Sequence, residues 1–253
     1  MDTDENKTTD PRPGEKYMTF LEHLEDLRKC LLVSIGMVFG TTVLAFFFSD
    51  WLLKIFSKPI QGIVKLHTSS FAETFGVSIK LSVICGLFIS FPVVLHQLWR
   101  FVSPGLYNKE RKYLVRFIIW AWISFIIGGF FAYFAMIPVA LQMMVRFTPA
   151  EIENTWFVSK YISLVMIMML SCGLLFDTPL VILLLSRLGI INPRKLSKYR
   201  GYALLASFII GAVLTPPDPI TQTMLAVPLY VLFEISIWLA VLLGYGTKEE
   251  TST

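Results

Sequence analysis

The feature that most constrains this chain is a series of apolar runs that contain almost no charge. The first, Leu31–Phe48, has no charged residue and is long enough to cross the ~30 Å hydrocarbon core of a bilayer. Comparable runs follow at Val77–Leu98, Phe117–Leu141, Tyr161–Leu185, Tyr202–Thr215 and Ile220–Leu243. Because a segment in lipid must satisfy its own backbone polar groups, such runs predict helices. We therefore expect an all-α, polytopic membrane protein with six transmembrane helices.

Composition and the polar ends of the chain agree with this class. The chain is 55% hydrophobic and 16% charged, with a mean hydropathy of +0.65, which is typical of polytopic membrane proteins. Residues 1–16 are polar and are expected to form a disordered tail, residues 17–244 a single membrane domain, and residues 245–253 a second tail. The N-terminal residues lack the pattern of a cleaved signal peptide, so none is expected to be removed.

The distribution of lysine and arginine predicts the orientation. Cations concentrate before the first span and in the second and fourth connections: Arg12, Lys16, Arg28, Lys29, Arg100, Lys109, Arg111, Lys112, Arg116, Arg187, Arg194, Lys195, Lys198 and Arg200. Because cytoplasmic loops carry the excess of positive charge, both termini should be cytoplasmic. The fifth span, Tyr202–Thr215, covers only about 21 Å at 1.5 Å per residue and is too short for a full bilayer.

A few polar residues and prolines interrupt the spans, and Asp177 and Pro179 are expected to break the fourth. Lys80 is near enough to one end of its span to extend toward the interface, and Pro92 is expected to kink the same span. Asp177 and Glu234 would each cost a few kcal/mol as charges in lipid, so they should face protein or water. Two interpretations stay open for each acid, a helix–helix hydrogen bond that stabilises packing or a contact with a partner subunit.

The stretch Thr19–Lys29 joins the polar tail to the first span. Thr19 and Glu22 have the spacing of a capping box, and leucines recur beyond them at helical spacing. Glu22, Glu25 and Asp26 then share one face, so the segment can form a helix along the membrane surface that presents an acidic patch. The alternative is an ordinary solvated face in which Glu25 pairs with Lys29.

Signals for catalysis or metal binding are nearly absent from the sequence. His23, His67 and His96 fall at different depths without a second ligand at metal spacing. The cysteines have no CxxC spacing, and none of the hydrolase, zincin or phosphate-loop motifs occurs. Asp177 and Asp218 lie at different depths, which argues against an intramembrane aspartyl protease. We expect no enzyme, metal site, cofactor or nucleic-acid partner.

Several segments, in order along the chain, resemble the TatC family, the receptor subunit of the twin-arginine protein translocase. They are HLEDLRK at His23–Lys29, SKPI at Ser57–Ile60, IKLSV at Ile79–Val83, FPVVLHQLWRFVSPGLYNKERK at Phe91–Lys112, FDTP at Phe176–Pro179, and LTPPDPITQTMLAVPLYVLFEIS at Leu214–Ser236.

The resemblance implies a non-enzymatic receptor in the cytoplasmic membrane. Its fold would be a glove-shaped bundle of six helices with short fifth and sixth helices. It would bind the twin-arginine signal peptides of folded precursors and work with single-span partners similar to TatB and TatA. Self-association is also expected.

The resemblance also implies a signal-peptide site, with Asp26 and Glu110 as its two acids. The wider set is Glu25, Arg28 and Phe101. Two carboxylates suit two guanidinium groups, because each planar fork of donors matches a carboxylate bidentately. Asp26 stands where the family usually has glutamate and reaches one methylene less, so Glu25 and Glu22 remain alternatives. A local charge pair between Glu110 and its basic neighbours is the simpler interpretation of that residue.

Further residues match family positions inside the membrane. Thr215 and Gln222 correspond to a polar cluster on the fifth and sixth helices that is implicated in partner binding. We expect Asp177 and Glu234 to belong to the same group of intramembrane polar residues. Asp177 replaces the family's usual glutamate. Structural roles are expected for Pro59, Pro92 and Pro104. The competing hypothesis is a small-molecule secondary transporter, although the two halves of the sequence show no inverted repeat.

Overall fold

The structure is a computed structural model that describes residues 20–102, 111–147, 155–187, 190–215 and 218–243. Within these ranges it is nearly all helical. In chain order the elements are α1 (Phe20–Phe46), α2 (Ser49–Phe56), η1 (Lys58–Ile60), β1 (Lys65–His67), α3 (Phe71–Val102), α4 (Arg111–Phe131), η3 (Ala132–Met136), α5 (Ile137–Arg146), β2 (Thr155–Phe157), α6 (Val158–Phe176), α7 (Thr178–Arg187), α8 (Pro193–Leu196), η4 (Ser197–Tyr199), α9 (Arg200–Leu214) and α10 (Pro219–Leu242).

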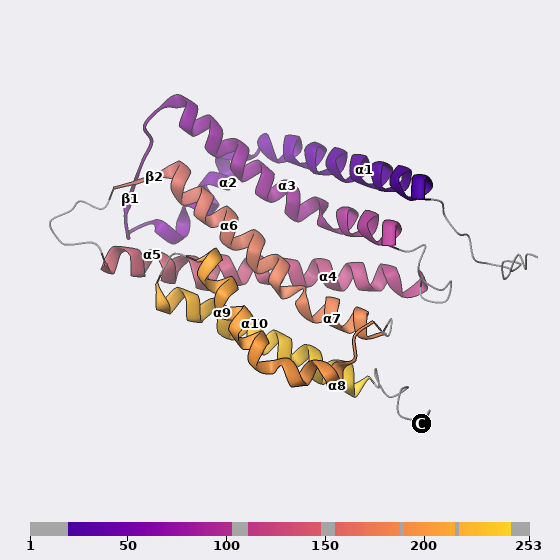
Figure 1. The fold of residues 1–253 in the computed structure, drawn as a ribbon. Coiled ribbons are helices and arrows are strands. Elements are labelled where there is room, and N and C mark those ends of the chain that lie inside the picture. The colour runs from indigo at the N-terminus through magenta and orange to yellow at the C-terminus, as the bar shows by residue number, and fades with distance from the viewer. Residues whose placement is uncertain (1–19, 103–110, 148–154, 188–189, 216–217, 244–253) are drawn as a thin grey trace, which may run out of the picture.

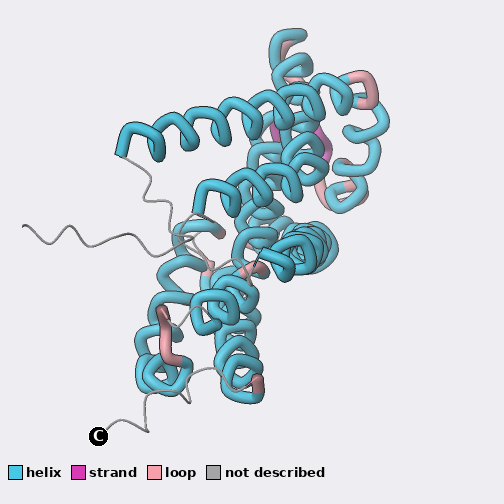
Figure 2. Tube along the Cα trace, turned by 90° about the vertical axis from the view of Figure 1, so that its right-hand side faces the viewer, coloured by secondary structure: helices cyan, strands magenta, loops and turns pink. Residues whose placement is uncertain are grey.

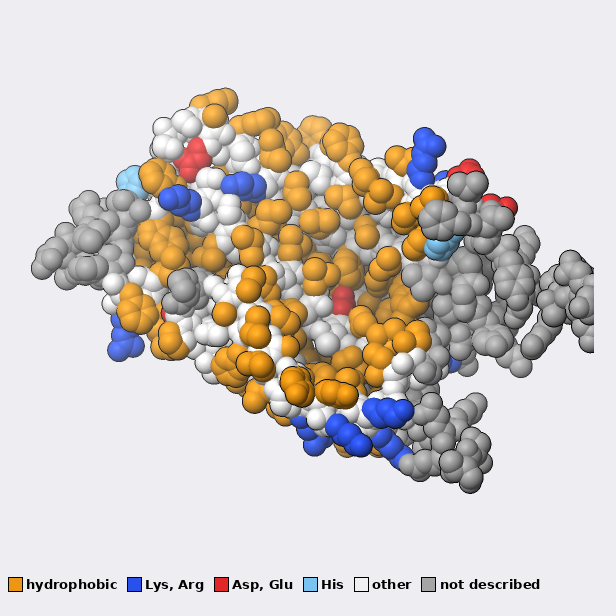
Figure 3. Space-filling model, in the orientation of Figure 1, with side chains coloured by type: hydrophobic (Ala, Val, Ile, Leu, Met, Phe, Trp, Pro, Cys, Tyr) orange, Lys and Arg blue, Asp and Glu red, His pale blue; other side chains and the backbone are white. Residues whose placement is uncertain are grey.

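Helices of membrane-spanning length dominate the fold. Among the described residues, 5 helical segments are long and apolar enough to cross a bilayer: Glu22–Phe46, Phe71–Phe101, Val115–Arg146, Val158–Arg187 and Pro219–Leu242. α1 lies beside α3, α4 packs on α6, and α9 and α10 form a hairpin whose second helix also packs on α7 (Figure 1). Figure 2 shows the same bundle from the side, with the short strands among the helices. Hydrophobic side chains cover the middle of the face in Figure 3, with Lys and Arg toward its ends.

The expected surface helix at Thr19–Lys29 is not a separate element in the described part. From Phe20 onward these residues are the first turns of α1, which continues as one helix of 27 residues to Phe46. No proline or glycine separates the acidic turns from the apolar run, so nothing ends the helix between them. Thr19, and with it the capping box, lies outside the described residues, as do both predicted tails.

The prediction of an all-helical chain needs a small correction. β1 and β2 form a parallel pair in which Lys65 lies opposite Thr155 and His67 opposite Phe157. Each strand has 3 residues, too few for alternating polarity to show in the sequence. The pair ties the first long connection, which also contains α2 and η1, to the segment that enters α6.

Two tyrosine hydroxyls attach α2 to the core. Tyr161 Oη donates to the Phe56 carbonyl at 2.7 Å, and Tyr133 Oη donates to the Ile55 carbonyl at 2.7 Å. These bonds satisfy carbonyls in the last turn of α2, where no intrahelical partner is available. Ile60, in the η1 element that follows α2, is 1% exposed, so the segment formed by α2 and η1 is part of the packed interior.

The lengths of the last two helices differ from each other. α9 has 15 residues, about 22 Å, which confirms the short fifth helix. The short sixth helix implied by the resemblance is wrong for this chain, because α10 has 24 residues and continues through Pro228. The expected interruption of the fourth span is confirmed, because α6 ends at Phe176 and α7 begins at Thr178.

Prolines have the positions that a helical membrane protein tolerates. Pro92 lies inside α3, which continues to Val102, so it does not end the helix. Pro59 stands in the first positions of η1, where a missing N–H costs little. Pro104 lies outside the described residues.

Lys80 contacts a neighbouring helix instead of extending into water. Its Nζ donates to Ser159 Oγ and Ser163 Oγ, each at 2.8 Å, across the contact between α3 and α6. Glu73 Oε1, two turns earlier on the same face of α3, accepts from the Ser159 backbone N–H at 3.1 Å. Together these contacts set the position of the N-terminal turns of α6 against α3.

Replacing Lys80 with methionine should lower the free energy of unfolding by about 1–2 kcal/mol, because charge-assisted hydrogen bonds are lost and the chain length is kept. Denaturant titration of the detergent-solubilised protein measures this. Lys54→Met in α2 is the matched control, because Lys54 is exposed. Equal stability of the two variants would mean that the Lys80 contacts contribute nothing measurable.

Candidate functional site

The first turns of α1 meet the last turns of α3 at one end of the bundle. The rings of His23 and Phe101 stack with their centroids 4.3 Å apart and an interplanar angle of 18°. This contact places the acidic turns of α1 beside the segment that leads out of α3. Nearby, Trp99 packs edge-on against Phe117 of α4 at 5.1 Å, which joins the second connection's two helices at the same end.

The neighbouring acids Glu25 and Asp26 have different surroundings. Glu25 Oε1 forms an ion pair with Lys29 Nζ at 2.9 Å, and both side chains are more than half exposed. The predicted Glu25–Lys29 pair is therefore confirmed. Asp26 is partly exposed and forms no ion pair or hydrogen bond within the described ranges. Of these two acids, Asp26 is thus the one whose carboxylate is available to an incoming cation. Arg28, two residues further along α1, is exposed.

The second predicted acid, Glu110, lies outside the described residues. α3 ends at Val102 and α4 begins at Arg111, so the chain between them connects the ends of two helices that pack on each other. Phe101 is in the last turn of α3 and Glu110 directly precedes α4. Asp26, Glu25 and Arg28 lie on the turns of α1 that follow His23, the residue that stacks on Phe101.

Asp177 stands at the junction of α6 and α7. It is the C-cap residue of α6 and only 7% of it is exposed. Its Oδ1 has no hydrogen-bond partner among the described residues. The helix–helix hydrogen bond considered for this acid is therefore not found in that part of the chain, and a contact with a partner remains the open alternative.

Thr215 and Gln222 contribute to packing within the α9–α10 hairpin. Gln222 Nε2 donates to the Phe208 carbonyl at 3.0 Å, and Thr215 Oγ1 donates to the Gly211 carbonyl at 2.9 Å. A Cβ on Gly211 would lie 3.0 Å from the Gln222 carbonyl oxygen, so the two helices approach closely here. Asp218 caps the start of α10, because its Oδ2 accepts from the Thr221 N–H at 2.7 Å.

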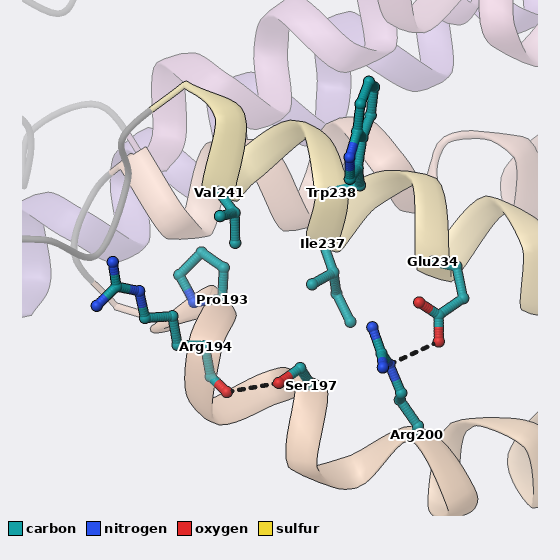
Figure 4. Close-up of a pocket in the computed structure, with 8 residues that line it drawn as sticks. All are labelled: Pro193, Arg194, Ser197, Arg200, Glu234, Ile237, Trp238 and Val241. Carbon is teal, nitrogen blue, oxygen red and sulfur yellow. Dashed lines mark hydrogen bonds and ion pairs between the residues drawn. The ribbon is translucent and has the colours of Figure 1, made fainter.

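Glu234 is the intramembrane acid that the structure does pair. Its Oε1 lies 2.9 Å from Arg200 Nε (Figure 4). The same oxygen accepts a hydrogen bond from Tyr230 Oη at 3.0 Å. The interpretation as a helix–helix contact is confirmed for this residue. The sequence alone puts Arg200 in a basic connection and does not identify it as the partner of Glu234, because no short spacing relates residues on two different helices.

No group of three or more His, Cys, Asp or Glu side chains that could hold a metal ion occurs in the part of the chain that the structure describes. The arrangement is one of polar contacts between helices and one partly exposed acidic turn, which is suited to binding a partner.

Known proteins resemble the chain over most of its length. The family model described as "Sec-independent protein translocase protein (TatC)" matches residues 22–228. The chain belongs to the TatC family. A TatC protein of Carboxydothermus hydrogenoformans is 36% identical over 228 residues, which are 89% of this chain and 94% of the relative. The Escherichia coli TatC is 34% identical over 242 residues, 93% of each chain.

Solved structures of TatC have the same fold. A crystal structure described as the twin arginine translocase receptor TatC in DDM superposes with a TM-score of 0.78 at 35% identity, covering 87% of this chain and 99% of that one. A second TatC crystal structure gives a TM-score of 0.76 at 34% identity. The chain is thus a membrane subunit of a protein translocase and not an enzyme, and the transporter hypothesis has no support.

Proposed function

We propose that this TatC protein binds the twin-arginine signal peptides of folded precursors, with Asp26 and Glu110 as the acids that receive the two arginines. The observation that carries the proposal is the partly exposed Asp26 carboxylate, which has no partner among the described residues. The solved relatives are twin arginine translocase receptors, which supports the class of ligand.

The difference between Asp26 and Glu25 favours Asp26 as the α1 acid. A guanidinium that approached Glu25 would have to displace Lys29, which lies 2.9 Å from its carboxylate. A guanidinium that approached Asp26 would displace only water and could bind bidentately. Phe101, held beside His23, offers an aromatic surface on which an arginine or an apolar residue of the peptide can pack.

We further propose a glove-shaped, six-span arrangement in which α9 is the additional, short span and both termini are cytoplasmic. The support is the concentration of cations at the ends of α1, α3, α4 and α7 that face one side, together with the positive-inside rule. Single-span partners of the TatB and TatA type would dock on the α9–α10 hairpin. On α9 the exposed apolar residues are Tyr202, Leu205, Ile209 and Val213. The helix is about 22 Å long and therefore shorter than the hydrocarbon core, so a partner helix that covers it would relieve the mismatch. Self-association and residence in the cytoplasmic membrane complete the proposal.

The experiment that tests the receptor proposal is retention of a signal peptide by the purified full-length protein. An immobilised twin-arginine peptide should retain the protein, and a peptide with Lys-Lys in place of Arg-Arg should lose at least about tenfold in affinity, because lysine cannot form the bidentate contact. Fluorescence anisotropy with the same peptides gives the ratio of dissociation constants. Equal affinity for both peptides would overturn the proposal.

The orientation predicts which residues are reached by an impermeant thiol reagent. Cysteines placed at Asn108 and Asn192 should react only from the cytoplasmic side, and a cysteine at Asp218 only from the outside, in a background without Cys30, Cys85 and Cys172. Labelling in intact cells and in inverted vesicles measures this. Labelling of the Asn108 position from the outside would contradict the six-span arrangement.

A further inference from the structure

A pocket lies between the basic segment α8–η4 and the last turns of α10. Its volume is about 310 Å³, and Figure 4 shows the side chains that line it. The lining residues are Pro193, Arg194, Ser197, Arg200, Glu234, Ile237, Trp238 and Val241. None of these residues belongs to the signal-peptide site proposed above, and the pocket lies on a different part of the bundle from α1.

Cations surround this pocket. Arg194 and Arg200 line it, and Lys195 and Lys198 stand exposed on the same short segment. Glu234 is the one acid in the lining, and its carboxylate is already bound to Arg200 at 2.9 Å. Arg200 is also the first residue of α9, a helix that no side chain caps, so the partial positive charge of its N-terminal amide groups adds to the field. The pocket therefore favours an anion.

An apolar stripe leads away from the pocket along α10. Val231, Ile235, Trp238 and Leu242 are exposed and recur at intervals of three or four residues, which places them on one helical face. Trp238, at 65% exposure, belongs to both the lining and the stripe, and its ring projects from α10 on the side away from α8 and η4 (Figure 4). Tryptophan is enriched at membrane–water interfaces, because its ring is apolar and its N–H is polar.

We propose that this pocket binds the phosphate headgroup of an anionic phospholipid, with the acyl chains along the stripe on α10. The charge of the lining selects the headgroup, and the stripe distinguishes a lipid from a soluble anion, because it continues from the pocket toward the middle of the span. Arg194 and Lys198 attract the phosphate, and Trp238 packs against the acyl chains on its side of α10. Arg200 orients the site through its contact with Glu234.

The proposal is tested with purified full-length protein by native mass spectrometry in detergent, with phosphatidylglycerol or phosphatidylcholine added at equal concentration. Phosphatidylglycerol should bind preferentially. Lys198→Gln and Arg194→Gln should each lower its affinity roughly fivefold, since each removes one cation near the headgroup. Lys54→Gln is the matched control, because Lys54 is an exposed cation on α2, near the opposite end of the bundle, and should leave the affinity unchanged.

Two comparisons within the same experiment can overturn the proposal without any variant. Equal binding of the two lipids by the unmodified protein would mean that the headgroup is not selected. Displacement of phosphatidylglycerol by millimolar inorganic phosphate would assign the pocket to a soluble anion. Unchanged binding by both Lys198→Gln and Arg194→Gln would place the lipid elsewhere on the protein.

Discussion

Replacing Gly128 with leucine should prevent α4 from packing on α6 and should leave little folded protein. A Cβ at Gly128 would lie 2.5 Å from the carbonyl oxygen of Cys172 and 2.9 Å from the Cα of Gly173. Both are backbone atoms of the facing helix, so no side-chain rotation relieves the overlap, and the helices must separate. Overpacking in a core typically costs about 1–3 kcal/mol, and a backbone clash between two spans belongs at or above the upper end of that range.

The measurement is the yield of monodisperse protein after detergent extraction, followed by thermal unfolding of what remains. Gly36→Leu in α1 is the matched control, because a Cβ there meets nothing within 4 Å and the substitution adds the same apolar bulk. The control should behave like the unmodified protein. Similar yields and melting temperatures for the two variants would mean that α4 and α6 are not held in this close contact.

Removing either acid of the proposed signal-peptide site should weaken binding of a twin-arginine peptide. Asp26→Asn and Glu110→Gln should each cost about 1–3 kcal/mol, or roughly fivefold to 150-fold in affinity, because each leaves a guanidinium without its charged acceptor. Glu25→Gln is the control, and it should change affinity less than about threefold, since that carboxylate is engaged by Lys29 in an exposed pair. Protein level and labelling pattern should stay the same in all three variants.

A double-mutant cycle assigns the contacts. Each acid is combined with an Arg→Gln change at one or the other arginine of the peptide, and the coupling free energy is the departure from additivity. Each acid should couple strongly to one arginine and weakly to the other. Coupling near zero for both acids, in folded receptors, would move the binding site elsewhere. A large effect of Glu25→Gln together with a small effect of Asp26→Asn would reverse the assignment between the two neighbouring acids.

Local sequence determined which parts of this protein are helices in the membrane. The sequence shows three such features: the charge-free run after Leu31, the break next to Asp177 and the short run that forms α9. Each depends on residues close together in the chain, because the length and hydropathy of a run, or a proline that follows an acid, are local properties. The ion pair of Glu25 with Lys29 belongs to the same class, since residues four apart on a helix are neighbours in any fold.

The limits of local patterns appear where helices begin and end. The acidic turns before Leu31 could have formed a surface helix or the start of the span, and both suit the same residues. α5 extends to Arg146, beyond the expected end at Leu141, because residues 142–146 contain neither proline nor glycine and nothing ends the helix at Leu141.

Only the tertiary structure decided which distant residues meet. Lys80 with Ser159, Arg200 with Glu234, and Gly128 with the Cys172 carbonyl are contacts between different helices. The packing of the whole bundle determines which helices become neighbours. It also determines which residues of one helix contact which residues of the next. Hydropathy specifies that a segment enters the membrane, but it is nearly the same for every orientation of that segment about its axis. The close approach of small residues and a few interhelical hydrogen bonds choose among those orientations, and these interactions exist only once the helices are assembled.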